Sequence, residues 1–175
     1  MLGEPEAMLN LSAPVAATLG SSNVLVKLFA AAQQETGPVQ LDCTHTKFFD
    51  AFGATLLAAL LASRKQDGRE TRFVPPYDAD VKRFAAEVGL PAFIQSPEVR
   101  EGTLEIRQLR ALNALYTSQV TDLLERGVDG INSDNSYPIQ LCLNELLQNV
   151  FEWSESRIGC TVLARWYKAT RSVKM

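Results

Sequence analysis

The alternation of short strand-like runs with helical runs between residues 23 and 90 constrains the fold more than any other feature. Residues 39–43 and 71–74 have the composition of short strands. Helical patterns occupy residues 23–34, 52–64 and 79–88. Turn-forming residues follow each pattern, namely residues 37–38, residues 66–68 and Gly89. Strands that alternate with helices of this length predict a small layered structure with crossover connections. We therefore expect an α/β (α+β) protein whose first domain comprises residues 1–92.

Part of this first domain has a specific pattern, carried by residues 41–43, 48–53 and 81–90. Residues 39–90 resemble a STAS domain, the fold of anti-anti-sigma factors, which implies a mixed sheet. Such domains carry Asp-Ser-x-Gly at a switch turn, where a partner kinase phosphorylates the Ser. The residues at this turn are Asp50, Ala51, Phe52 and Gly53, so no hydroxyl occupies the acceptor position. The resemblance therefore implies an interaction turn that serves docking or dimerisation without the phosphorylation switch.

A second strong pattern predicts an amphipathic helix over residues 138–153. Its apolar side chains recur at helical spacing and fall on one arc: Ile139, Leu143, Leu146, Leu147, Val150 and Trp153. Asn144, Gln148 and Glu152 fall on the opposite arc.

Two polar residues of this helix have chemistry of their own. Glu145 and Asn149 are four residues apart, so they project from one face at the edge of the polar arc. A carboxylate and a carboxamide placed in this way offer an oxygen ligand for Mg²⁺ and a general base near water. The same spacing is also found in ordinary amphipathic helices with a solvated polar face, so spacing alone leaves both interpretations open.

The wider segment, residues 139–154, resembles the N-box helix of the GHKL superfamily. These Bergerat-fold ATPases include sensor histidine kinases, anti-sigma-factor kinases and gyrase. The resemblance implies that Glu145 is the general base toward the γ-phosphate and that Asn149 is a Mg²⁺ ligand. Asn144 and Gln148 would then be flanking polar residues of the Mg-ATP site. Relatives often carry His, Tyr or Lys where this chain has Trp153, which we interpret as a core aromatic residue.

The segments around this helix complete the expected second domain. Residues 93–102 predict a linker, residues 102–109 a strand and residues 115–126 a helix. A strand is predicted at residues 157–167, a turn at 168–170 and the start of another strand at 171–175. By resemblance, residues 103–175 would form an incomplete Bergerat-type α/β sandwich.

In GHKL proteins the next strand leads into an Asp-x-Gly-x-Gly box, whose Asp reads the adenine amino group. The sequence ends at Met175, before this box. We therefore expect a truncated reading frame or a fragment, which binds Mg-ATP only when the missing half is supplied and is inactive alone. An unpaired sheet edge near the end would favour self-association into a homodimer.

Composition and charge exclude several classes of function. The formal net charge of −3 argues against general binding to nucleic acid or to an anionic membrane surface. Residues 54–62 form the longest small apolar run, which is too short to span a bilayer, and no secretory signal is evident. Cys43, Cys142 and Cys160 lie far apart in apolar runs, and we interpret them as reduced core residues of a cytoplasmic protein.

The single histidine and a series of basic residues could indicate a functional site, but ordinary structural roles explain both better. His45 is the only histidine and follows a predicted strand, so we interpret it as a loop residue and not as a phosphorelay histidine. Basic residues recur every third position near the end of the chain: Arg165, Lys168, Arg171 and Lys174. A solvated sheet edge explains this spacing better than a nucleic-acid interface does.

Three interpretations remain open from the sequence. The first is a regulatory protein related to GHKL ATPases or anti-sigma-factor serine kinases, with a STAS-like module in front. The second is a non-catalytic protein of bacterial signalling, in which both parts bind a regulatory partner protein. The third is an unrelated α/β binding domain, in which case both resemblances are accidental. The first is favoured as ancestry, and the second is a serious rival for this polypeptide.

Overall fold

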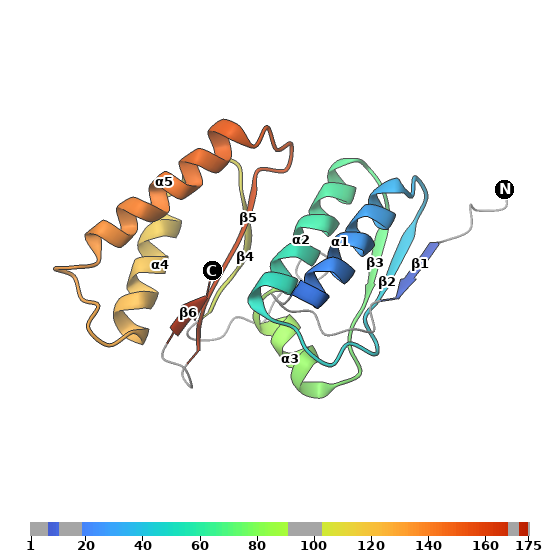
Figure 1. Ribbon diagram of the computed structural model, residues 1–175, viewed down its shortest axis with the longest axis horizontal. Coiled ribbons are helices and arrows are strands. Elements are labelled where there is room, and N and C mark those ends of the chain that lie inside the picture. Colours follow the sequence, from blue (N-terminus) through green and yellow to red (C-terminus); the bar gives the residue numbers. More distant parts are fainter. Residues whose placement is uncertain (1–6, 11–18, 91–102, 168–171, 175) are drawn as a thin grey trace. The chain divides into compact units, whose positions relative to one another are not determined.

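The computed structural model describes residues 7–10, 19–90, 103–167 and 172–174 (Figure 1). The chain divides into two compact units, unit 1 (Met1–Glu98) and unit 2 (Val99–Met175). Each unit combines helices with its own small sheet, which confirms the expected α/β (α+β) class. The division falls within the segment 93–102 that the sequence predicts as a linker, and this segment lies outside the described residues.

Unit 1 is built on a three-stranded parallel sheet in the order β1-β2-β3. Its elements follow one another along the chain: β1 (Ala7–Asn10), α1 (Leu19–Gln34), β2 (Val39–Asp42), α2 (Ala51–Gln66), β3 (Thr71–Val74) and α3 (Ala79–Glu87). Parallel neighbours joined by right-handed crossovers place their helices on the same face of a sheet. Helices α1 and α2 accordingly lie side by side over one face (Figure 1). The expected mixed sheet is not found, because every described strand pair in unit 1 is parallel.

Local signals account for most boundaries in unit 1. Asp78 begins α3, because its carboxylate accepts hydrogen bonds from the backbone N–H groups of Asp80 and Val81. Gly89 follows the helix with a φ of +73°, a conformation that glycine adopts readily. Buried Leu25, Leu28 and Ala32 of α1 recur at helical spacing.

A fully buried arginine joins the elements of unit 1. The Arg64 guanidinium, near the end of α2, donates to four backbone carbonyl groups. They belong to Ala32, to Glu35 at 2.9 Å, to Gly37 at 2.7 Å and to Glu70 at 3.3 Å. Its Nε also donates to Thr71 Oγ1 at 2.7 Å. One side chain therefore connects α2 with the end of α1, the turn before β2 and the start of β3.

Unit 2 has an antiparallel sheet in the order β4-β5-β6. Its elements are β4 (Thr103–Leu109), α4 (Ala114–Gly127), α5 (Tyr137–Trp153), β5 (Cys160–Tyr167) and β6 (Ser172–Lys174). The carboxamide of Asn113 accepts from the Tyr116 N–H and begins α4. Pro138 lies in the first turn of α5, where its missing N–H needs no partner.

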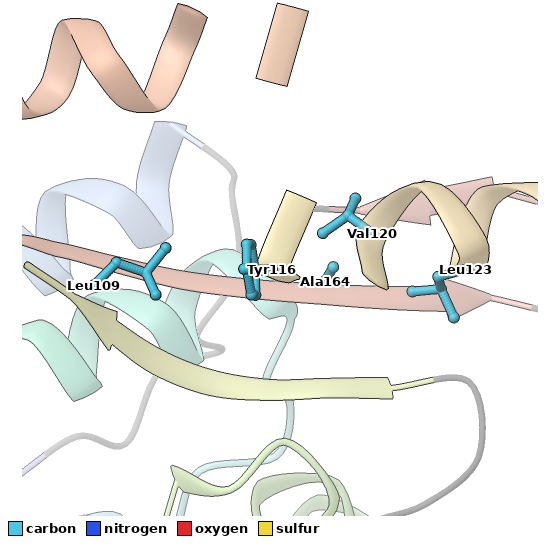
Figure 2. Close-up of a cluster of buried hydrophobic side chains, with 5 residues drawn as sticks. All are labelled: Leu109, Tyr116, Val120, Leu123 and Ala164. Atoms are coloured by element: carbon cyan, nitrogen blue, oxygen red, sulfur yellow. The ribbon is translucent and has the colours of Figure 1, made fainter. Parts of the chain in front are cut away.

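The core of unit 2 lies between α4 and the sheet. Figure 2 shows its buried members, which are Leu109, Tyr116, Val120, Leu123 and Ala164. Helix α5 reaches this core only with partly buried residues, namely Leu143, Leu147 and Phe151. No residue of α5 is fully buried. The helix is therefore held along one side and presents the rest of its surface to solvent.

One glycine controls how the chain passes from α5 into β5. Gly159 has a φ of +77°, and a Cβ atom at this position would lie 2.1 Å from the backbone oxygen of Leu109. Leu109 pairs with Cys160 in the β4–β5 ladder. The close approach of the two backbones at this end of the ladder therefore requires a residue without a side chain.

The structure differs from the sequence prediction in a few elements. Helix α1 begins at Leu19, four residues before the predicted start, and β1 was not predicted. Strand β5 begins at Cys160 and not at Arg157, because residues before Gly159 form a turn. The predicted turn at residues 168–170 lies outside the described residues. Among the described helices, none is long and apolar enough to cross a membrane.

Candidate functional site

The predicted ATPase residues lie on the outward face of α5. Glu145 and Asn149 are both exposed and are one helical turn apart. The structure thus brings these two residues together, as the spacing predicts. The action of Glu145 and Asn149 on a nucleotide stays a prediction.

The apolar arc of α5 is placed differently from the prediction. Leu146 is 62% exposed and Trp153 is 79% exposed, so neither belongs to the core. The interpretation of Trp153 as a core aromatic residue is wrong. The physical reason is that α4 and β5 cover the side of α5 that carries Leu143, Leu147 and Phe151. This side overlaps the predicted arc at Leu143 and Leu147 but leaves Leu146 and Trp153 uncovered. Leu146 and Trp153 therefore flank Glu145 and Asn149 at the surface.

The two flanking polar residues, Asn144 and Gln148, differ in exposure and in hydrogen bonding. Asn144 is half-buried, and its Oδ1 atom is buried without a hydrogen-bond partner among the described residues. Gln148 is exposed, and its Nε2 donates to Glu152 Oε1 at 2.7 Å. Asn144 therefore lies where the polar arc meets the covered side of α5, whereas Gln148, one turn later on the same arc, faces solvent.

The face formed by Glu145 and Asn149 has the oxygen chemistry that Mg²⁺ prefers. In the described part of the chain, no three His, Cys, Asp or Glu side chains gather into a metal-binding group. Helix α5 contains no Lys or Arg, so it supplies no cation for the phosphates of a nucleotide. The helix alone thus fits the metal better than it fits the phosphates.

The predicted interaction turn lies at the start of α2. Asp50 is the N-cap, and its Oδ1 accepts from the Gly53 N–H at 2.8 Å. The Asp50 carbonyl also accepts from the Ala54 N–H at 3.0 Å. Ala51 and Gly53 are buried, whereas Phe52 points outward and is 45% exposed. The capped backbone therefore fixes the point on the surface from which the Phe52 side chain projects.

A second phenylalanine precedes this turn. Phe48 is 51% exposed, and its neighbour Phe49 is buried. Burial of Phe49 anchors the loop, while Phe48 and Phe52 both reach solvent four residues apart. The predicted interaction turn includes Phe52 but not Phe48. The signal that could have found Phe48 is a pair of aromatic residues directly before a predicted turn.

A hollow of about 530 Å³ lies at the edge of the sheet where β2 and β3 end. Its lining residues follow these two parallel strands and are Thr44, His45, Thr46, Lys47, Tyr77 and Asp78. We call it the carboxyl-edge hollow. His45 lies in the loop after β2, as predicted, and its sequence context alone does not indicate a binding role. The tendency of parallel sheets to bind ligands beyond the carboxyl ends of their strands is the signal that could have found it.

Two groups that directly precede the lining residues have shifted pKa values. Asp42 Oδ1 accepts from the Thr44 N–H at 2.9 Å, and this hydrogen bond lowers the pKa of the Asp42 carboxyl below its ordinary value. Burial raises the pKa of the Cys43 thiol to about 12, so this thiol is protonated at neutral pH.

The cysteines are only partly placed as the sequence predicts. All three are free, and Cys43 is buried as expected. Cys160 is half-buried, and Cys142 is exposed on α5, so the interpretation of Cys142 as a core residue is wrong. The reason is the same as for Leu146, since both side chains project from the uncovered side of this helix.

Comparison with known proteins gives no match. No family model fits the sequence, and neither a curated protein nor a solved structure is significantly similar to it. The resemblances to STAS domains and to the GHKL superfamily therefore stay predictions, and function must be argued from the geometry of these surfaces.

Proposed function

We propose that this protein is a cytoplasmic regulatory protein of signalling, which acts by docking onto a partner protein through the interaction turn at the start of α2. The observation that carries the proposal is the exposure of Phe48 and Phe52 on a capped, locally rigid turn. Aromatic residues are enriched in protein interfaces, because a rigid ring buries a large area with little loss of conformational entropy.

The details of the turn support docking over a phosphorylation switch. Ala51 occupies the first position of α2, is buried and has no hydroxyl. The nearest hydroxyl inside the helix, that of Thr55, donates to the Ala51 carbonyl at 2.7 Å. The turn thus offers a fixed apolar surface and no obvious phosphoacceptor.

Photocrosslinking in cells tests this proposal. Replacing Phe52 with p-benzoylphenylalanine places a photoreactive ring where the natural ring is exposed. We expect one discrete crosslinked protein, which mass spectrometry identifies. With this partner purified, Phe52→Ala should weaken binding at least about tenfold, because loss of a central interface side chain typically costs more than 1 kcal/mol.

The control places the same photoreactive residue at position 65, where Lys65 is exposed in the last turn of the same helix. Position 65 should give no such product. If positions 52 and 65 give the same crosslinks, or if Phe52→Ala binds the purified partner as tightly as the natural chain, the interaction turn is not a docking site.

A second candidate function is Mg-ATP binding on α5. The observation that favours it is the placement of Glu145 and Asn149 one turn apart on one exposed face. In the order of elements, α4 precedes this helix and an antiparallel strand pair follows it, as expected for a GHKL-type domain. Glu145 would act as general base, and Asn149 would bind Mg²⁺.

Tryptophan fluorescence is a direct readout for this second candidate, because exposed Trp153 lies one turn beyond Asn149. When the half that the GHKL resemblance implies is supplied, Mg-ATP should change the emission, and Asn149→Ala should abolish that change. If ATP is hydrolysed, Glu145→Ala should lower the rate by about 10²–10⁴-fold, the usual contribution of a general base. Asp122→Ala on α4 removes another exposed carboxylate and should leave both readouts unchanged. A rate unaffected by Glu145→Ala contradicts the general-base role.

A further inference from the structure

Neither proposed function uses the carboxyl-edge hollow. The charged groups at the hollow differ in whether they have hydrogen-bond partners. The carboxylates nearest to it already accept hydrogen bonds from the backbone. Asp42 Oδ1 accepts from Thr44, and Asp78 Oδ1 accepts from Asp80 at 2.9 Å and from Val81 at 3.1 Å. Both carboxylates are therefore held by the turn that each one begins.

The cation in the lining of the hollow, Lys47, has no such partner among the described residues. Lys47 is exposed, and among the described residues its ammonium group has no hydrogen-bond or ion-pair partner. Both carboxylates keep their negative charge, but neither forms an ion pair with Lys47 in the described part of the chain. An exposed ammonium group without such a partner can bind an anion. Phosphate is a strong acceptor of such a charged donor.

Two other lining residues are aromatic. The rings of His45 and Tyr77 meet edge to face, with centroids 5.9 Å apart and an interplanar angle of 81°. The Tyr77 N–H donates to the Thr44 carbonyl at 2.9 Å, which joins the loop after β3 to the loop after β2. Tyr77 is nevertheless 78% exposed, so its ring is available to a ligand.

The size of the hollow also fits a small molecule. Its volume of about 530 Å³ lies within the range of known ligand sites, about 300–1,000 Å³. We propose that the carboxyl-edge hollow binds a small phosphate monoester that carries a planar ring. The phosphate lies at Lys47, and the ring packs against the His45–Tyr77 pair. The lining does not include Phe48 or Phe52, the residues that carry the docking proposal, although Lys47 directly precedes Phe48.

The single histidine of the chain gives this proposal a local readout. The ring C–H signals of His45 in a proton NMR spectrum need no assignment, because there is no second histidine. At fixed pH, phenyl phosphate should shift these signals in a saturable way. Lys47→Gln should weaken the binding of phenyl phosphate about tenfold, the usual effect of losing one hydrogen bond to a charged group. Tyr77→Ala should weaken it as well.

Three comparisons decide the outcome. Lys65→Gln removes an exposed lysine at the far end of α2 and should leave the affinity for phenyl phosphate unchanged. Phenol should bind much more weakly, since it lacks the phosphate, and inorganic phosphate should bind more weakly, since it lacks the ring. The proposal is overturned if phenyl phosphate gives no saturable shift, if Lys47→Gln binds it as tightly as the natural chain, or if phenol binds equally well.

Discussion

Replacing Arg64 with methionine is expected to lower the free energy of unfolding by about 4 kcal/mol, among the largest effects of any single substitution. Methionine has a similar length but no donors. Four backbone carbonyl groups and the Thr71 hydroxyl would lose a donor inside unit 1, and no substitution can remove these carbonyls. This situation differs from a buried ion pair, in which both charged partners can be replaced together by apolar side chains.

Urea denaturation followed by far-ultraviolet circular dichroism measures this effect. Hydrogen exchange should locate it, with lost protection in β2, β3 and the end of α1. The control is Lys65→Met, which makes the same kind of change at the next residue of α2, where the side chain is exposed. An exposed site should change stability by less than about 0.5 kcal/mol. Equal unfolding midpoints for the two variants would show that the Arg64 hydrogen bonds contribute nothing to stability.

Replacing Gly159 with alanine is expected to destabilise unit 2 by about 3–4 kcal/mol, because a steric clash adds to backbone strain. The new Cβ atom would lie 2.1 Å from the Leu109 backbone oxygen, which cannot move away like a flexible side chain. The two backbones would have to separate where Leu109 pairs with Cys160. Tryptophan fluorescence during urea denaturation follows this change, because both tryptophans, Trp153 and Trp166, belong to unit 2.

Gly130→Ala is the matched control in the same unit. Gly130 has a φ of +86°, but a Cβ atom there would meet nothing within 4 Å. Its replacement therefore isolates the conformational part of the effect, about 1–2 kcal/mol. If Gly159→Ala destabilises no more than Gly130→Ala does, the close approach to Leu109 is relieved without loss of the ladder, and the steric explanation is wrong.

The elements that the sequence predicts well are those with strong local signals. Strand β3 has the predicted bounds, and α3 begins at the Asp78 cap and ends before Gly89 as expected. Helix α1 begins earlier than predicted, because Ser21 and Ser22 look like an entry signal although the helix already contains them. Strand β1 has four residues and no alternation, and it forms through its backbone pairing with β2.

The candidate sites follow the same division between local and tertiary information. Helical spacing places Glu145 and Asn149 on one face, and the structure agrees. Which arc of the helix is covered depends on α4 and β5, so the spacing alone did not show that Leu146 and Trp153 are exposed. The role of Arg64 was also hidden, since its partners are backbone carbonyls up to 32 residues away. Such partners leave no pattern in the sequence.

Helix α5 contributes partly buried side chains to the core of unit 2 and not a single fully buried one. Its outward positions are therefore nearly free of the requirement that most restricts sequence change in proteins, the need to fill a core. Substitutions there can alter what this surface binds with little effect on folding. For an experimenter the same property makes the outer half of α5 a place to build a randomised library, and for natural selection it is a surface on which specificity can change one residue at a time.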